Sequence, residues 1–199
     1  MGSTTNDVLD MLLARLAQSK LTRQQITTFL TDMFIAASDT STVTVQRALA
    51  QLLRHPEKME KLRAELVARL GFNEFIKATD LDDLPYLQAV VKETLRLHPA
   101  VPLIPREVVA DGVSLGGFPV PIGRDEKAWP QPEEFVPEGF LGVSVYTAHS
   151  VPLLLASLPH KMEWKLPEGM GPDDIDLSDR YGTVLDLATP LRAVPVSAA

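Results

Sequence analysis

The sequence predicts a mainly α-helical protein with a small β portion, and two observations lead to this prediction. Apolar residues recur with a helical period through the first half of the chain, residues 1–99. Prolines are concentrated in the second half, residues 100–199: of the 16 in the chain, only Pro56 and Pro85 precede position 99. Because proline interrupts helices and inner strands, we expect short strands and irregular loops in that half.

The first half divides into helices at recognisable start and stop signals. Pro56 suits the first turn of a helix, Gly71 is a stop signal, and Asp82-Asp83 followed by Pro85 resembles a helix start. The apolar faces and these signals together predict four helices, which cover residues 8–16, 26–52, 57–70 and 82–95.

The second half has shorter periods and more turn residues. Val108 to Leu115, with a turn signal at Asp111-Gly112, predicts a β-hairpin. The apolar run from Val151 to Leu158 is short enough for one helix, and the tail from Trp164 onward favours short strands. No linker separates the halves, so we expect a single domain over residues 1–199.

Composition excludes several classes of function. With 199 residues and 45% hydrophobic content, the chain can bury one ordinary core. Its 19 basic and 26 acidic residues give a net charge of −7 without a basic stripe, so we expect no nucleic-acid partner. The absence of cysteine excludes disulfides, thiolate catalysis and cysteine-ligated metal or haem sites.

The sequence shows no recognisable targeting signal. Residues 1–20 lack the basic and apolar blocks of a signal peptide, and nowhere do 18 uncharged apolar residues follow one another. We therefore expect no membrane anchor, and the localisation stays open.

A run of five polar residues, Ser38 to Thr42, interrupts the long apolar helix. Ser, Thr and Asp are mediocre helix formers, so local propensity gives no reason for the run. Two interpretations remain open, a solvated face and a turn that takes part in chemistry. The spacing alone favours the solvated face.

Four stretches, taken in order, carry a resemblance to a known family. They are "AASDTS" (36–41), "ETLRLHP" (93–99), "PREVVAD" (105–111) and "FVPEGF" (135–140). Together they resemble the C-terminal part of a cytochrome P450, a haem-thiolate monooxygenase, and most closely the plant microsomal enzymes. The resemblance implies a truncated cytochrome P450 fold with a long central helix, a Glu-x-x-Arg helix, a β-hairpin and an irregular tail.

The resemblance also implies roles for individual residues. Asp39 would deliver protons for oxygen activation, Thr40 would orient water, and Arg106 would bind a haem propionate. Glu93 and Arg96 would form the structural pair of the Glu-x-x-Arg helix. In the family this pair is buried and tied to an arginine at the position held here by Gly139, so we expect one buried charge to lack a partner.

Two internal pieces of the family pattern are absent. A strand hairpin is missing after Pro121, and the loop with the iron-binding cysteine is missing after Gly142. We therefore expect no metal ligand. His149 lies nearest the missing loop and is the one histidine considered as a substitute; its ligation would imply peroxidase-like or binding behaviour rather than monooxygenation.

By resemblance, the family function is haem-dependent oxidation of a small plant metabolite with O2. Its electrons come from NADPH through NADPH-cytochrome P450 reductase at the endoplasmic reticulum membrane. Without the cysteine and the N-terminal half, we expect this chain to be inactive and its haem binding to fail. The alternative is a non-catalytic helical protein that binds a partner or itself through the apolar face of residues 26–52. A third interpretation is an incomplete gene product.

Overall fold

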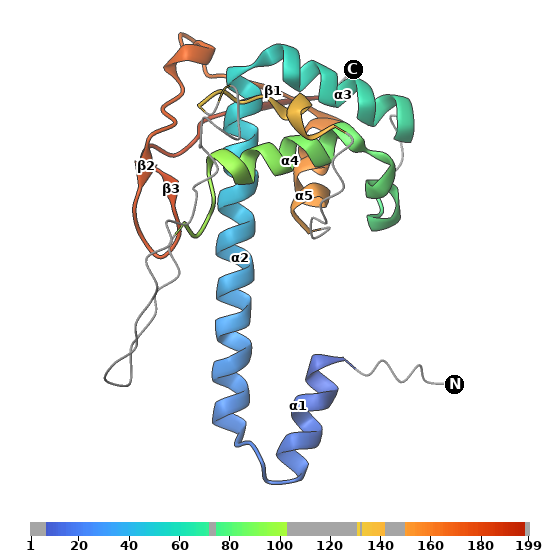
Figure 1. The fold of residues 1–199 in the computed structure, drawn as a ribbon, viewed down its shortest axis with the longest axis vertical. Coiled ribbons are helices and arrows are strands. Elements are labelled where there is room, and N and C mark those ends of the chain that lie inside the picture. Colours follow the sequence, from blue (N-terminus) through green and yellow to red (C-terminus); the bar gives the residue numbers. More distant parts are fainter. Residues whose placement is uncertain (1–6, 72–74, 103–130, 132, 142–149, 198–199) are drawn as a thin grey trace. The chain divides into compact units, whose positions relative to one another are not determined.

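The computed structural model describes residues 7–71, 75–102, 131, 133–141 and 150–197 (Figure 1). Its α-helices are α1 (Val8–Ala17), α2 (Arg23–Arg54), α3 (Pro56–Leu70), α4 (Pro85–Leu97) and α5 (Ser150–Lys161). Short 3-10 helices are η1 (Ala78–Asp83), η2 (Pro137–Phe140) and η3 (Pro172–Asp174). No described helix is both long and apolar enough to span a membrane.

The strands are confined to the C-terminal tail of the described chain. β1 (Met162–Lys165) pairs antiparallel with β4 (Val194–Ser197), and β2 (Asp179–Arg180) pairs antiparallel with β3 (Asp186–Leu187). The predicted fold class, mainly α with a small β portion, is confirmed. The hairpin predicted at residues 108–115 lies outside the described residues.

Helix ends follow the local signals with one exception. Pro56 occupies the first turn of α3, and Gly71 ends that helix with a φ of 66°, which favours glycine. The exception is α4, which begins at Pro85 rather than at Asp82. Residues 78–83 form the separate helix η1, because a backbone bond from the Leu84 N–H to the Leu81 carbonyl closes a 3-10 turn there.

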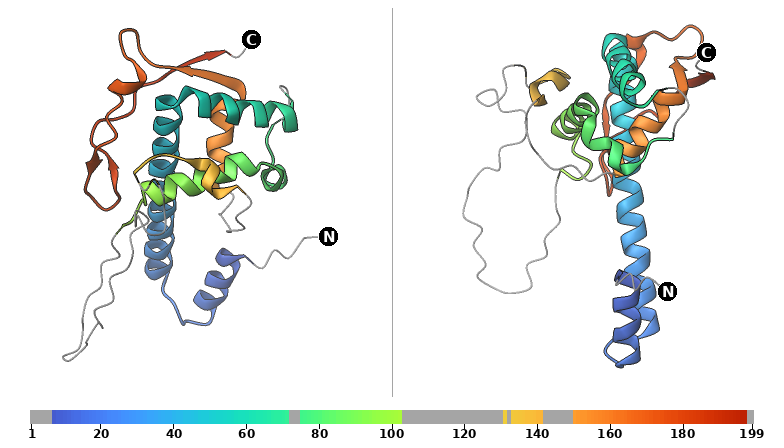
Figure 2. Two further views of the ribbon diagram at one scale, coloured as in Figure 1. Left: turned by 45° about the horizontal axis from the view of Figure 1, so that its top comes forward. Right: turned by 90° about the vertical axis from the view of Figure 1, so that its right-hand side faces the viewer.

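The chain divides within α2 into two compact units, residues 1–39 and residues 40–199. We call them the N-terminal unit and the C-terminal unit. In the C-terminal unit, helices α3, α4 and α5 pack against one another and against the C-terminal end of α2 (Figures 1 and 2). Their facing side chains form the main core, which includes Ala48, Leu52, Leu62, Leu66, Leu81, Leu84, Leu87, Val90, Val91 and Leu155.

A second core lies between α2 and the C-terminal tail. Leu49, Ala50 and Leu53 of α2 pack against Ile175 and Leu187. Because α2 contributes to both cores, it is enclosed on two sides between residues 47 and 53. This double burial explains why the sequence there is apolar on more than one helical face.

The N-terminal unit has few buried side chains. α1 buries no residue, and in this part of α2 Ile26 is the buried apolar side chain, with 6% exposure. The long apolar face predicted over residues 26–52 is therefore exposed in one part and buried in another. It is exposed around Phe29 and Phe34, and it is buried in the C-terminal unit around Leu49 and Leu52.

Candidate functional site

The predicted oxygen-activating turn lies in the middle of α2. Asp39 ends the N-terminal unit and is exposed, whereas Thr40 begins the C-terminal unit and is half-buried. The Thr44 hydroxyl donates to the Thr40 carbonyl at 2.8 Å, a bond that satisfies the buried hydroxyl within the helix. A carboxylate and a hydroxyl thus occupy consecutive positions of α2. Their role in oxygen activation stays a prediction.

Glu93 and Arg96 of α4 form a buried, two-pronged ion pair. Arg96 Nε lies 2.6 Å from Glu93 Oε2, and Arg96 Nη2 lies 2.8 Å from Glu93 Oε1. Their side chains are 2% and 4% exposed, respectively. A guanidinium matches a carboxylate in this parallel geometry, which makes the bonds both short and directional.

Backbone groups complete the pair and correct one expectation from the sequence. Arg96 Nη2 donates to the Glu134 carbonyl at 2.9 Å, and the Val136 N–H donates to Glu93 Oε1 at 2.7 Å. Neither buried charge lacks a partner, although Gly139 stands where the family has arginine. The segment before η2 satisfies the pair with main-chain groups, which depend on chain path rather than on side-chain identity.

Glu138 of η2 forms a second polar cluster at the edge of the main core. Lys61 Nζ lies 2.9 Å from Glu138 Oε1, Lys58 Nζ lies 3.7 Å from Oε2, and the Tyr86 hydroxyl donates to Oε1 at 3.3 Å. Lys61 Nζ also lies 4.5 Å from the centre of the Tyr86 ring, a cation–π distance. The cluster joins η2 to both α3 and α4.

The charges of this cluster shift two pKa values. Burial acts to raise the pKa of Glu138, but the hydrogen bond from Lys61 and the charges of Lys58 and Lys61 outweigh it and lower the pKa below its ordinary value. Burial and the negative charge of Glu138 raise the pKa of Tyr86 well above its usual range. This shift favours the protonated hydroxyl, which is the form that donates to Glu138.

Arg47 of α2 is fully buried and holds the C-terminal tail. It donates to the Leu177 carbonyl at 2.8 Å, to Asp179 Oδ1 at 2.6 Å and to the Asp186 carbonyl at 2.6 Å. Burial lowers the pKa of Arg47, and the charge of Asp179 opposes that shift. Three acceptors on one guanidinium fix strands β2 and β3 against α2.

Glu65 of α3 caps the start of α4. Its carboxylate accepts from the Tyr86 N–H at 2.7 Å and from the Leu87 N–H at 2.9 Å. The first N–H groups of a helix have no partner within it, and a negative charge there is favourable.

Sequence reasoning missed Arg47, Glu65 and Glu138. For Arg47 a signal was present, because it is a charged residue inside the apolar stretch of α2. Glu65 lies on the polar face of a predicted helix, and Glu138 lies in a stretch for which no helical period was found. Their partners are far away in sequence, so no local pattern indicates them.

The histidines of the described chain are engaged with protein groups. His55 Nδ1 lies 2.8 Å from the Gln51 carbonyl, His98 Nε2 lies 2.8 Å from the Gln51 side-chain nitrogen, and His160 Nε2 lies 2.7 Å from the Gly71 carbonyl. Among the described residues, no group of three potential ligands could hold a metal ion. His149 and Arg106 lie outside the described residues.

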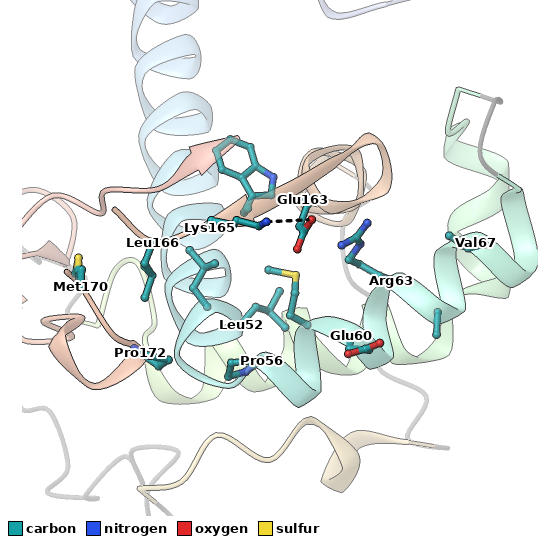
Figure 3. Close-up of a pocket in the computed structure, with 14 residues that line it drawn as sticks. Leu52, Pro56, Glu60, Arg63, Val67, Glu163, Lys165, Leu166, Met170 and Pro172 are labelled. Atoms are coloured by element: carbon teal, nitrogen blue, oxygen red, sulfur yellow. Dashed lines mark ion pairs between the residues drawn. The ribbon is translucent and has the colours of Figure 1, made fainter. Parts of the chain in front are cut away.

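A groove of about 720 Å³ lies between α3 and β1 in the C-terminal unit (Figure 3). Its lining includes the apolar side chains of Leu52 and Met59 and the charged side chains of Arg63 on α3 and Glu163 on β1. Lys165 pairs with Glu163 at 3.8 Å. Of the predicted site residues that the structure describes, Asp39, Thr40, Glu93 and Arg96, none lines this groove.

The family model described as cytochrome P450 matches residues 2–154 of the chain. The chain belongs to the cytochrome P450 family. The match includes the turn with Asp39 and Thr40 and the helix with Glu93 and Arg96, and the resemblance inferred from the sequence is confirmed.

Plant cytochromes P450 are among the most similar relatives. Oryzalexin E synthase of Oryza sativa subsp. japonica is 39% identical over 232 residues, which cover 96% of this chain and 45% of that protein. Cytochrome P450 76T24 of Catharanthus roseus is 39% identical, covering 98% of this chain and 46% of that protein. The chain therefore spans about half the length of the curated relatives it matches.

A solved structure shares the fold. A zebra fish cytochrome P450, solved with abiraterone, matches with a TM-score of 0.75 and 25% sequence identity, covering 90% of this chain and 49% of that chain. The arrangement of helices described above is accordingly that of a partial cytochrome P450.

The alignment lengths support gaps inside the matched region. The alignment with oryzalexin E synthase runs over 232 positions, whereas this chain has 199 residues. The difference, 232 less 199, leaves at least 33 positions of the relative without a counterpart in this chain. This is the result expected if the pieces after Pro121 and Gly142 are absent.

The family implies haem, but the residues of this chain do not fit an iron-thiolate site. The chain contains no cysteine. The three described histidines bond to Gln51 or Gly71, and no metal-binding group exists among the described residues.

Proposed function

We propose that this chain is a catalytically inactive member of the plant cytochrome P450 monooxygenases. The observation that carries the proposal is a contrast within one chain. The scaffold pair Glu93–Arg96 is buried and fully bonded, yet no cysteine is present to bind iron. Such a chain keeps the packing of the family and lacks the axial ligand on which its oxidation chemistry depends.

The names of the relatives support an inference about the ancestral activity. One of them is named ent-cassadiene C11-alpha-hydroxylase 1 of Oryza sativa subsp. japonica, with 38% identity. We infer that the chain derives from an enzyme that oxidised a small plant metabolite with O2 and electrons from NADPH-cytochrome P450 reductase. Asp39, Thr40 and Arg106 would be remnants of its oxygen-activating turn and propionate contact.

Haem titration of the purified chain, followed by the ferrous carbon-monoxide difference spectrum, tests the proposal. We expect no saturable haem binding, and no product when reductase, NADPH and a diterpene are added. A full-length plant relative, such as oryzalexin E synthase, is the positive control under identical conditions. Product formation coupled to NADPH consumption would overturn the proposal. So would saturable binding with a nitrogen-ligand spectrum that His149→Ala abolishes, because it would reveal a new haem site.

A second function, partner binding, is favoured by the N-terminal unit. Its helices expose large apolar side chains, including Phe34 at 73% and Met11 at 57%. Exposed apolar clusters on soluble chains usually mark a binding surface or a tendency to aggregate. Static light scattering of the purified chain distinguishes a binding surface from aggregation. A defined complex gives a single molar mass, whereas an aggregate gives a broad distribution of molar masses.

A further inference from the structure

The N-terminal unit exposes apolar side chains on both of its helices. α1 and residues 23–39 of α2 are joined by a short turn, residues 18–22 (Figure 1). The exposed apolar side chains are Val8, Leu9, Met11, Leu13, Phe29, Met33, Phe34 and Ile35. Exposed apolar patches of this kind mark an interaction surface or a tendency to aggregate.

Phe29 lies between two hollows of opposite character. One, of about 310 Å³, is lined by apolar side chains of α1 and by the cations Arg15 and Lys20. The other, of about 470 Å³, is lined by polar side chains of α2 and by the anion Asp32. Phe29 borders both hollows. An aromatic side chain therefore stands with positive charge on one side and negative charge on the other.

The described charged residues of the unit are Asp7, Asp10, Arg15, Lys20, Arg23, Asp32 and Asp39, and five of them show the same separation. Arg15, Lys20 and Arg23 gather at the turn between the helices, whereas Asp10 and Asp32 lie away from it. All five side chains are exposed. Within the part of the chain that the structure describes, none of them takes part in an ion pair.

A surface with this distribution is complementary to itself. If a second copy is turned by a twofold rotation about an axis near Phe29, the turn of each copy meets the Asp32 region of the other. Each Phe29 then faces the apolar hollow of its counterpart, with Asp32 beside Arg15 and Lys20 of the second copy. Twofold interfaces are built in this way, from one patch that is used twice.

We propose that the face of the N-terminal unit around Phe29 binds a second copy of this chain in an antiparallel, twofold arrangement. The observations that carry the proposal are the apolar hollow beside Phe29 and the opposite charges on its two sides. The proposal is independent of haem, because none of these residues is among the predicted haem contacts.

A charge-swap experiment on the full chain tests the proposal. The first variant, Arg15→Glu with Lys20→Glu, makes the turn acidic; the second, Asp10→Lys with Asp32→Lys, makes the other end basic. Sedimentation equilibrium at low salt should show a dimer for the native chain and a dissociation constant raised at least about tenfold for each variant alone. A one-to-one mixture of the variants should restore a dimer.

The control keeps the net charge and moves the change elsewhere. Glu163→Lys with Lys165→Glu reverses an exposed pair of the C-terminal unit and should change the dissociation constant less than about twofold. Phe29→Asp should also dissociate the dimer, because it places a charge in the apolar hollow. Circular dichroism of every variant verifies that its helices are intact.

Three results would overturn the proposal. A monomeric native chain at high concentration shows that the face is not a self-association surface. A heterogeneous aggregate that the swaps do not alter shows association without a defined geometry. A monomer that instead binds the N-terminal part of a plant cytochrome P450 shows that this part, not a second copy, covers the face.

Discussion

The two units of this chain differ in how far their charged and apolar side chains are buried. In the C-terminal unit, Glu93, Arg96 and Arg47 are buried and bonded, and the apolar side chains around them are closed off from water. In the N-terminal unit the charges are exposed, and so are Phe29 and Phe34. The difference indicates that the folding free energy of the chain is concentrated in residues 40–199.

The physical reason lies in how each unit is covered. Helices α3, α4 and α5 and the C-terminal tail pack against their section of α2, so apolar side chains are buried on two of its sides within residues 40–199. α1 has no buried side chain, so its apolar residues add little to stability in an isolated copy. Substitutions should therefore have large effects in one unit and small effects in the other.

The largest effect is expected when the Glu93–Arg96 pair is broken. Glu93→Gln keeps the shape of the side chain but removes its charge, and Arg96 is left buried without a counter-ion. Breaking such a pair costs on the order of 3–5 kcal/mol. Urea denaturation followed by circular dichroism should show this decrease in the free energy of unfolding, or a chain that does not fold.

The matched control for this change lies in the N-terminal unit. Phe34→Ala removes a larger side chain that is 73% exposed, and it should change the free energy of unfolding by less than about 0.5 kcal/mol. If the two variants lose similar amounts, stability is not concentrated in the C-terminal unit, and the contrast between the units is wrong.

An intermediate effect is expected when Arg47 is replaced. Arg47→Met keeps most of the apolar stem but leaves the Leu177 and Asp186 carbonyls without their donor. Because the Asp179 side chain is 27% exposed, water can solvate its carboxylate when Arg47 is absent. The expected loss in the free energy of unfolding is therefore about 2 kcal/mol. Hydrogen exchange should increase in residues 177–187, where β2 and β3 lie.

Arg180→Met is the matched control for Arg47. Arg180 pairs with Asp186 at 2.8 Å, but its side chain is 63% exposed. Solvent screening limits such a pair to less than about 1 kcal/mol. Equal exchange rates in the two variants would mean that Arg47 does not hold the tail against α2.

The sequence was sufficient to predict the helices because each depends on local signals. The apolar period and the cues at Pro56 and Gly71 predicted α3 within one residue of its observed bounds, Pro56–Leu70. The family resemblance named Glu93 and Arg96, whose pairing follows from their spacing of three on a helix. The roles assigned to Asp39 and Thr40 stay predictions.

What the sequence did not predict depends on contacts between distant segments. The prediction that one charge of the Glu93–Arg96 pair lacks a partner was wrong. Main-chain groups of Glu134 and Val136 take the place of the absent arginine side chain. The start of α4 was misplaced because its capping group is Glu65, which lies 20 residues before Pro85 on another helix. Such partners are fixed by the path of the chain, which no local window contains.

The smallest effect is expected in the pH dependence of the cluster around Glu138. Lys61 and Lys58 hold the pKa of Glu138 below its ordinary value of 4.5. Because the folded pKa is the lower one, the stabilisation is fully present above pH 4.5 and is lost as the pH falls through the folded pKa. The Glu138 side chain is 37% exposed, so screening limits this contribution to less than about 1 kcal/mol.

Glu138→Gln should remove this contribution. Between about pH 6 and about pH 3, a range that brackets the titration, the free energy of unfolding of the variant should therefore decrease less than that of the native chain. Lys61→Met removes the nearest cation and should reduce the same difference. Urea denaturation at the two pH values measures it in all three chains. If the variant follows the native pH dependence, η2 is held to α3 and α4 by the Glu93–Arg96 pair and its backbone partners, and the charge of Glu138 adds nothing to that attachment.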